Sequence, residues 1–185
     1  NLADDKLVIG HVGRLTPVKN HDKTFEIAKV IQENNLDAKI LIIGSGNLEE
    51  ELKAKAADLD ILDTVIFTGR ISPISEFYPA LDVLLLPSFT EGLPTTVVEV
   101  QGAGVPTVMS NTITTEVDLA LGMVATCKLD DSGQTWLNSL QQMANTTIPP
   151  LENRLDALEN NHFSNEASAK LYVDFFVGRI NDFQL

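Results

Sequence analysis

Short apolar runs recur along the chain, and a stretch of helical periodicity follows most of them. Runs such as Val83-Leu84-Leu85-Leu86 show no polar alternation, which is typical of strands covered on both faces of a parallel sheet. Strands that alternate with helices are joined by right-handed crossovers. The pattern therefore predicts an α/β fold, a doubly wound, Rossmann-like parallel sheet of about six strands with helices on both faces.

The elements of this fold can be placed by residue range. The predicted strands are 7–10, 39–43, 65–67, 83–86, 107–109 and 123–125. The predicted helices are 22–34, 48–57, 75–80, 95–103, 131–145, 151–160 and 165–181. In the first helix we expect Phe25, Ile27, Ala28 and Ile31 to point inward. Ligands of such sheets bind beyond the carboxyl ends of the strands, near the point where the strand order reverses.

One obvious linker, Ile148-Pro149-Pro150, divides these elements. We expect residues 1–147 to form the sheet domain. Residues 148–185 are expected to form C-terminal helices that pack on the same domain or extend toward a partner domain. Tyr172, Phe175 and Phe176 lie at helical spacing, which predicts core positions.

Length and charge exclude several classes of protein. The 185 residues, 44% of them hydrophobic, suffice for one domain with a real core. A formal net charge of −13 argues against nucleic acid as a partner. No apolar run approaches the ~20 residues that span a bilayer, and the start does not resemble a signal peptide. The single cysteine, Cys127, fits a reducing cytoplasm and is expected to be inert core.

The stretch from Ser88 to Glu99, which follows the fourth predicted strand, gives the strongest functional signal. Gly92 permits a close approach of backbone, and Pro94 suits the first turn of a helix. The free N–H groups of such a helix start, together with the helix dipole, form an anion site. Helical rise separates Thr95 from Glu99 by roughly 6 Å, about the span from a phosphate to the ribose of one nucleotide. A carboxylate there could accept a hydrogen bond from each of the two ribose hydroxyls.

Plainer interpretations of both carboxylates stay open. Ser88 and Glu91 have capping-box spacing, and a glutamate near a helix start is stabilising in any case. Glu99 lies among valines, where an unpaired charge is costly, so a buried Arg or Lys is another partner for it.

A second signal lies just past the first strand, in the loop from Gly13 to Asn20. Gly13 lets the chain turn, which brings Arg14 and Lys19 to the carboxyl edge of the sheet. An arginine fork and a lysine point charge suit a diphosphate and could stabilise it as a leaving group. A solvated loop with two surface cations is the alternative.

The remaining patterns are weaker. Gly44-Ser45-Gly46 begins like a dinucleotide fingerprint, but Glu49 replaces its third glycine, which favours a tight turn with a secondary ligand contact. Asp58-Leu59-Asp60 has metal-binding spacing but trails a helix, so we interpret it as a solvated helix end. Asp130-Asp131 is expected to cap the following helix.

The three histidines suggest no catalytic arrangement. His11 is expected to be packed near the site, His21 to begin a helix, and His162 to lie in a loop.

In order and rough spacing, these motifs resemble the retaining glycosyltransferases of family 4, which have the GT-B fold of two Rossmann-like domains. The matching motifs are Gly13-Arg14-Leu15, Lys19, Gly44-Ser45-Gly46, Pro87-Ser88, the pair Glu91 and Glu99, and Gly104-Val105-Pro106. Other segments resemble the branch that builds capsular polysaccharide or exopolysaccharide: Gly10 to Arg14, Lys19 to His21, Asn111 to Glu116 and Leu129 to Ser132. Leu93 and Pro94 stand where Phe-Gly is commoner.

The resemblance implies that residues 1–147 bind a nucleotide sugar, usually with UDP as the nucleotide. Arg14 and Lys19 would hold the donor diphosphate, and Glu99 the ribose. Glu91 would contact the transferred sugar and join those two cations as a catalytic residue. The other implied contacts are Gly13, Gly44, the Arg70-Ile71 loop against the base, and the amides of Gly92, Leu93 and Thr95. The resemblance implies no metal and no other cofactor.

The resemblance also implies a transferase that moves a hexose or N-acetylhexosamine from a UDP-sugar to a lipid-linked glycan acceptor, with retention. Its N-terminal acceptor domain lies outside this sequence, so we expect the chain alone to be inactive. We expect a cytoplasmic protein whose contact with the inner face of the membrane is made through that domain. A UDP-sugar 2-epimerase-like domain, a non-catalytic nucleotide-sugar-binding module and a Rossmann-like interaction domain without ligand stay open as alternatives.

Overall fold

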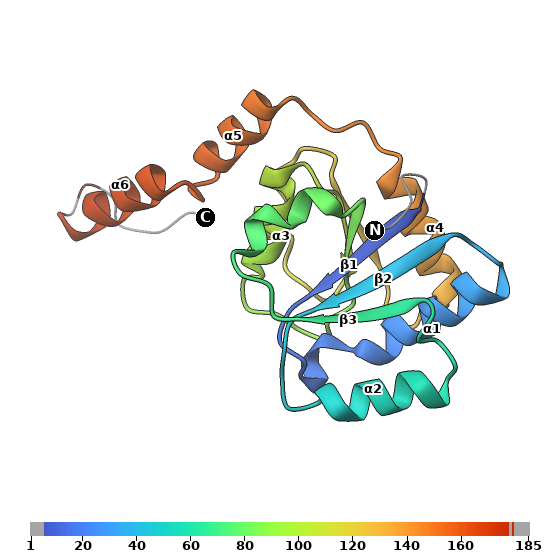
Figure 1. Cartoon of the computed structure of the whole chain (residues 1–185). Coiled ribbons are helices and arrows are strands. Elements are labelled where there is room, and N and C mark those ends of the chain that lie inside the picture. The colour runs from blue at the N-terminus through green and yellow to red at the C-terminus, as the bar shows by residue number, and fades with distance from the viewer. Residues whose placement is uncertain (1–5, 178, 180–185) are drawn as a thin grey trace.

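The computed structural model describes residues 6–177 and 179, and a six-stranded parallel sheet lies at the centre of this part (Figure 1). The strands are β1 (Leu7–Val12), β2 (Ala38–Ile43), β3 (Val65–Gly69), β4 (Val83–Leu86), β5 (Thr107–Ser110) and β6 (Val124–Cys127). Their order, β3-β2-β1-β4-β5-β6, and their parallel pairing confirm the predicted doubly wound α/β fold. The strand order reverses between β1 and β4, which makes this the switch point of the sheet.

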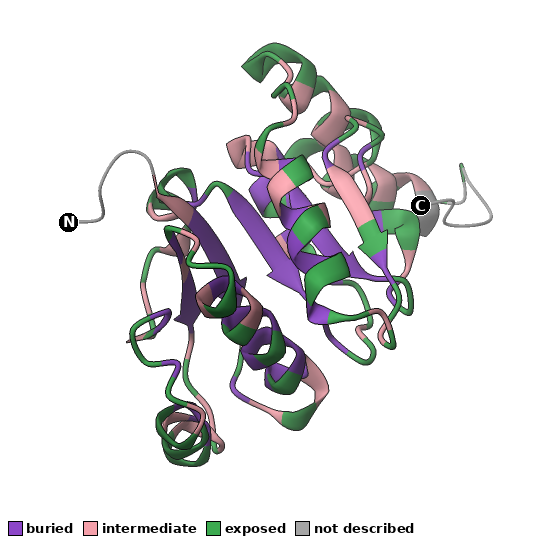
Figure 2. Cartoon of the chain, turned by 90° about the vertical axis from the view of Figure 1, so that its right-hand side faces the viewer, coloured by how far each residue is buried: buried purple, intermediate pink, exposed green. Residues whose placement is uncertain are grey.

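Helices cover both faces of the sheet. On one face lie α1 (His21–Glu33), α2 (Glu49–Asp58) and α4 (Gly133–Ala144), and on the other lies α3 (Thr95–Ala103). Two further helices, α5 (Leu151–Asn160) and α6 (Asn165–Phe176), follow at the C-terminal end. Alternate strand residues point to opposite faces, so Ile9 joins the core beneath α1, α2 and α4, and Val8 joins the core beneath α3. Figure 2 shows buried strands and helices whose outer sides are exposed. The four inward residues predicted for α1 are buried.

The loops that follow β1 and β2 stay hydrogen-bonded to each other beyond the strand ends. The amide of Gly13 donates to the carbonyl of Ile43 at 3.0 Å, and that of Leu15 to Ser45 at 3.1 Å. Gly44 has φ 148°, and a Cβ placed there would lie 1.9 Å from the carbonyl oxygen of Gly13. Only glycine fits such a contact. The hydrogen bonds and this close contact join the two loops into one continuous rim at the carboxyl edge of the sheet.

Two local predictions are wrong. The segment 75–80 forms two 3-10 turns, Ile74–Glu76 and Tyr78–Ala80, in place of one helix. Pro79 lacks an N–H and its ring would clash inside an α-helix, so a regular helix is disfavoured there.

The N-cap of α4 is Ser132, whose hydroxyl accepts from the Thr135 amide at 3.2 Å. Asp131 instead accepts from the Lys128 amide at 2.8 Å, which closes the turn before the helix.

The last two helices extend away from the sheet (Figure 1). Arg154 ties α5 to α3, because its Nη1 donates to the carbonyl of Gly102 at 2.5 Å. Tyr172, expected in a core, is 57% exposed, since α6 continues outward from α5. The helix α6 ends at Phe176, earlier than the predicted end near 181, and the side chains of Phe175 and Phe176 lie outside the described residues. In the described part, no helix combines the length and the apolar character needed to cross a bilayer.

Candidate functional site

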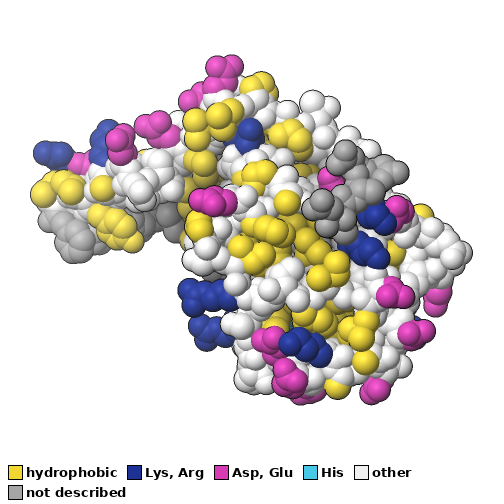
Figure 3. Space-filling model, in the orientation of Figure 1, with side chains coloured by type: hydrophobic (Ala, Val, Ile, Leu, Met, Phe, Trp, Pro, Cys, Tyr) yellow, Lys and Arg dark blue, Asp and Glu magenta, His cyan; other side chains and the backbone are white. Residues whose placement is uncertain are grey.

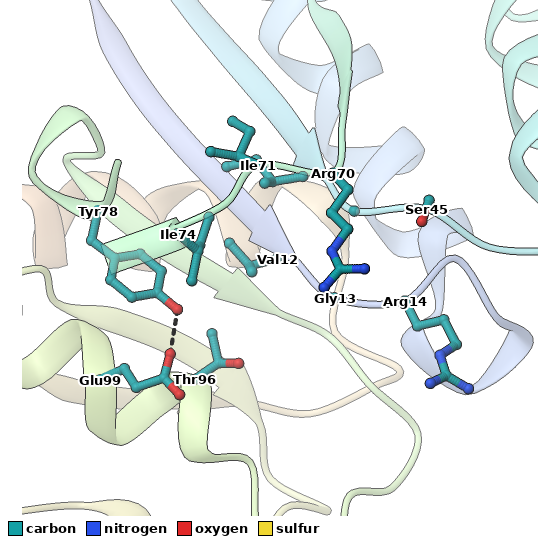
Figure 4. A pocket seen from close by; sticks show the side chains of 12 residues that line it. Val12, Gly13, Arg14, Ser45, Arg70, Ile71, Ile74, Tyr78, Thr96 and Glu99 are labelled. Carbon is teal, nitrogen blue, oxygen red and sulfur yellow. Dashed lines mark hydrogen bonds between the residues drawn. The ribbon is translucent and has the colours of Figure 1, made fainter. Parts of the chain in front are cut away.

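A cavity of about 450 Å³ opens at the carboxyl ends of β1, β2 and β3, beside the switch point. Its walls come from the loops after these three strands, from the two 3-10 turns before β4, and from α3 (Figure 4). This volume is in the range of small-molecule sites. The position is the one at which doubly wound sheets bind ligands.

One side of the cavity is basic. Arg14, in the loop after β1, and Arg70, directly after β3, line it together with Gly13, Gly44 and Ser45. Figure 3 shows basic side chains projecting from the edge of the molecule at which β1, β2 and β3 end. Among the described residues neither guanidinium forms an ion pair, so both are available to an anionic ligand.

The opposite side of the cavity is built from α3 and the turn that contains Tyr78. Glu99 and Thr96 project from α3, and the hydroxyl of Tyr78 donates to Oε2 of Glu99 at 2.5 Å (Figure 4). Burial, followed by the hydrogen bond to Glu99, raises the pKa of Tyr78, so the phenol remains a proton donor. A carboxylate offers about four acceptor positions. Glu99 therefore keeps acceptor capacity that faces the cavity.

Glu99 is not the buried carboxylate that its valine neighbours suggest. Val97, Val98 and Val100 are buried against the sheet, whereas Glu99 lies on the exposed side of α3 and lines the cavity. Its hydrogen-bond partner is Tyr78, and among the described residues no Arg or Lys forms an ion pair with it.

Lys19 and Glu91 lie against each other. Lys19 ends the 3-10 turn Pro17–Lys19, and its Nζ is 2.7 Å from Oε1 of Glu91, in the loop after β4. The two side chains are only 14% and 16% exposed. Both residues lie outside the cavity lining, but the Lys19 side chain folds over Gly13, where a Cβ would come within 2.7 Å of the lysine Cε. The ion pair therefore borders the basic side of the cavity.

The start of α3 differs in detail from the prediction. Gly92, Leu93 and Thr95 are exposed and lie outside the cavity lining, and the amide of Thr95 donates to the carbonyl of Leu93 at 2.9 Å. Thr96 lines the cavity in place of Thr95, because residues three apart also share a helix face with Glu99.

Pro94 is the N-cap of α3 and not its first helical residue, and no side chain of the described residues caps this helix. The capping-box interpretation of Ser88 and Glu91 is therefore wrong.

Of the residues predicted for the site, the structure brings six together in the cavity lining: Gly13, Arg14, Gly44, Arg70, Ile71 and Glu99. On the α3 side of the cavity, sequence reasoning misses two polar lining residues, Tyr78 and Thr96. Tyr78 is a lone hydroxyl-bearing residue in the stretch from Phe77 to Leu81, and this is the signal that could have indicated it.

Metal ligands do not gather in the described residues, where no group of three or more His, Cys, Asp or Glu side chains is placed to hold an ion. Asp58 and Asp60 are exposed at the end of α2, in agreement with a solvated helix end. Independence of metal stays a prediction.

Residues 1–120 match the family model of the group 1 glycosyl transferases. The chain belongs to this family. EpsF of Bacillus subtilis (strain 168), named as a glycosyltransferase, is 34% identical over 151 residues, which cover 82% of this chain and 39% of that protein. An Escherichia coli protein named UDP-Gal:alpha-D-GlcNAc-diphosphoundecaprenol alpha-1,3-galactosyltransferase is 37% identical over 113 residues, 60% of this chain and 29% of that one.

Solved structures of glycosyltransferases share the fold. The crystal structure of an S. aureus TarM variant in complex with fondaparinux, alpha-GlcNAc-glycerol and UDP matches 95% of this chain and 37% of that one, with a TM-score of 0.74 and 18% identity. At that identity the likeness shows the fold alone. This group 1 glycosyl transferase chain thus spans less than half the length of each of these relatives.

Proposed function

We propose that this chain is the donor-binding half of a retaining glycosyltransferase of family 4. In this proposal the whole enzyme transfers a hexose or N-acetylhexosamine from a UDP-sugar to a lipid-linked glycan in polysaccharide biosynthesis, in the cytoplasm. Family membership supports a transferase. The name of the E. coli relative, with a UDP-galactose donor and a diphosphoundecaprenol-linked acceptor, and the UDP in the TarM complex support the nucleotide and the acceptor class.

The observation that carries the proposal is the polarity of the cavity. Two guanidiniums, Arg14 and Arg70, which form no ion pair with the described residues, line one side, and the Glu99 carboxylate held by Tyr78 lines the other. A nucleoside diphosphate has the complementary arrangement, with anionic phosphates at one end and ribose hydroxyls that donate hydrogen bonds at the other. Ile71, beside Arg70, offers an apolar surface for the flat base.

The Lys19–Glu91 ion pair supports a nucleotide sugar as the full ligand. In a UDP-sugar the β-phosphate and the sugar share one oxygen, so groups that contact them must lie close together. Lys19 and Glu91 are 2.7 Å apart, which meets this requirement. An entering diphosphate competes for Lys19 and thereby frees a carboxylate oxygen of Glu91 for hydroxyls of the sugar.

The same groups account for catalysis in the proposed reaction. The bond between the anomeric carbon and the β-phosphate oxygen breaks, and its electron pair stays on the departing UDP. Arg14 and Lys19 are placed to stabilise this charge, because preformed cations act strongly on charge that develops in a transition state. A hydroxyl oxygen of the acceptor glycan, which the rest of the enzyme would hold, forms the new bond to the anomeric carbon, and its proton passes to the departing β-phosphate oxygen.

Titration calorimetry of UDP tests the proposal on this chain, in one buffer with EDTA and in another with Mg²⁺. We expect equal affinity in both buffers. Lys19→Ala should weaken binding about 10- to 100-fold, since a hydrogen bond to a charged group contributes about 1.5–3 kcal/mol. Lys29→Ala removes the same charge from an exposed position on α1 and should change nothing. Absence of UDP binding, or equal losses in the two variants, would contradict the proposal.

A further inference from the structure

Two buried histidines bracket the loop that carries the proposed phosphate contacts. His11 is the second-last residue of β1, and His21 is the first residue of α1, so Gly13, Arg14 and Lys19 all lie between them. The two imidazole rings stack with their centroids 4.6 Å apart and an interplanar angle of 8°. They are 1% and 4% exposed, and this contact joins the two ends of the loop.

Further hydrogen bonds hold the residues around this histidine pair in place. Nδ1 of His11 lies 2.8 Å from the hydroxyl of Thr24, which fastens β1 to the first turn of α1. Asn20, next to His21, is buried in the left-handed region at φ 53°, and its Nδ2 donates to the Pro87 carbonyl at 3.0 Å. Lys19 directly precedes Asn20 in the chain, so its backbone is adjacent to these contacts.

We propose that the histidine pair, His11 and His21, is a positioning element that closes the base of the loop and holds Lys19 in place only while both rings are neutral. This inference rests on the proposed function in one respect, that Lys19 binds the donor diphosphate. The closure of the loop itself does not depend on any ligand.

The surroundings of the pair disfavour a bound proton. Nε2 of His11 and Nε2 of His21 are buried, and among the described residues neither has a hydrogen-bond partner. Burial, the neighbouring His21 and the charge of Lys19 together lower the pKa of His11 well below 6.5. Burial lowers the pKa of His21 to about 4, with Asp22 opposing this shift and Lys19 adding to it. Lys19 is itself paired with Glu91, and Asp22 with Lys55.

The direction of the pH effect follows from these shifts. In an opened loop the rings regain the ordinary pKa of about 6.5, so they bind protons there before they do so in the closed state. Acidification from about pH 6.5 toward pH 4 therefore favours opening, whereas nothing changes above pH 7.5. Between pH 7.5 and 5.5, one such histidine increases the opened fraction about 10-fold and two increase it about 100-fold.

Amide hydrogen exchange by NMR, corrected for the intrinsic pH dependence of exchange, measures this opening without any ligand. Protection of the Gly13, Leu15 and Asn20 amides should fall about 100-fold from pH 7.5 to 5.5 in the native chain. It should fall about 10-fold in His21→Phe, which keeps a flat ring in the stack, and should not change in the His11→Phe/His21→Phe double variant. Amides of α4 should remain better protected throughout, because opening is local.

A pH response that is the same in native protein and in both variants, or loop amides that exchange only together with those of α4, would overturn the proposal. In a second arm, His21→Ala should weaken binding of UDP-glucose at pH 7.5 about 10-fold, and His21→Phe should not. UDP-glucose is the probe because it has no terminal phosphate that takes up a proton in this range. If the native chain does not bind UDP-glucose, the proposed function is contradicted. The hydrogen-exchange result then still tests whether the histidine pair closes the loop.

Discussion

The two sides of the cavity are held in place by different kinds of contact. On the loop side, main chain packs on main chain, and Gly44 touches Gly13 so closely that a Cβ would lie 1.9 Å from a carbonyl oxygen. On the α3 side, one side-chain hydrogen bond, from Tyr78 to Glu99, sets the direction of the carboxylate. We therefore expect the first side to tolerate no added atom at Gly44, and the second to lose the Tyr78 hydroxyl without a change in the fold.

The largest effect should come from adding a methyl group on the loop side. Gly44→Ala must displace the Gly13 loop and adopt φ 148°, which we expect to cost about 3 kcal/mol of unfolding free energy and to abolish UDP binding. Gly92→Ala is the matched control, because a Cβ there would have no atom of the described residues within 4 Å and φ is not positive. Urea unfolding should show the difference, and equal stability of the two variants would refute the close packing of the loops.

A smaller effect should come from removing one hydroxyl on the α3 side. Tyr78→Phe leaves the carboxylate of Glu99 without its donor, and we expect UDP affinity to fall about fivefold, the effect of about 1 kcal/mol for one hydrogen bond. Tyr172→Phe removes the same hydroxyl from exposed α6 and should leave calorimetric affinity unchanged. If Tyr78→Phe binds UDP as tightly as the native chain, the hydrogen bond from Tyr78 is not needed to orient the Glu99 carboxylate for binding.

The same contrast explains what the sequence could predict. The sheet, its strands and the loop side follow from local signals, because apolar runs, glycines and strand ends are consecutive in the chain. Gly13, Arg14 and Gly44 therefore appear in the cavity as expected.

The α3 side depends on contacts between distant segments. Tyr78 comes from a turn 21 residues before Glu99, and no periodicity indicates that its hydroxyl points to that carboxylate. Helical spacing allows either Thr95 or Thr96 beside Glu99, and only packing of the valines on the sheet selects Thr96. The 2.7 Å contact of Lys19 with Glu91 likewise joins loops 72 residues apart.

The central claim is that Glu99 binds the ribose, and one comparison of ligands tests it most directly. Affinities of UDP and 2′-deoxy-UDP are measured by calorimetry for the native chain and for Glu99→Gln, with Glu50→Gln on exposed α2 as the control. Loss of the 2′-hydroxyl should lower the affinity of the native chain and of the control about 10-fold, because a hydrogen bond to a carboxylate is lost. The same change should lower the affinity of Glu99→Gln about twofold. An equal loss of affinity from UDP to 2′-deoxy-UDP in all three proteins would contradict the assignment of Glu99 to the ribose.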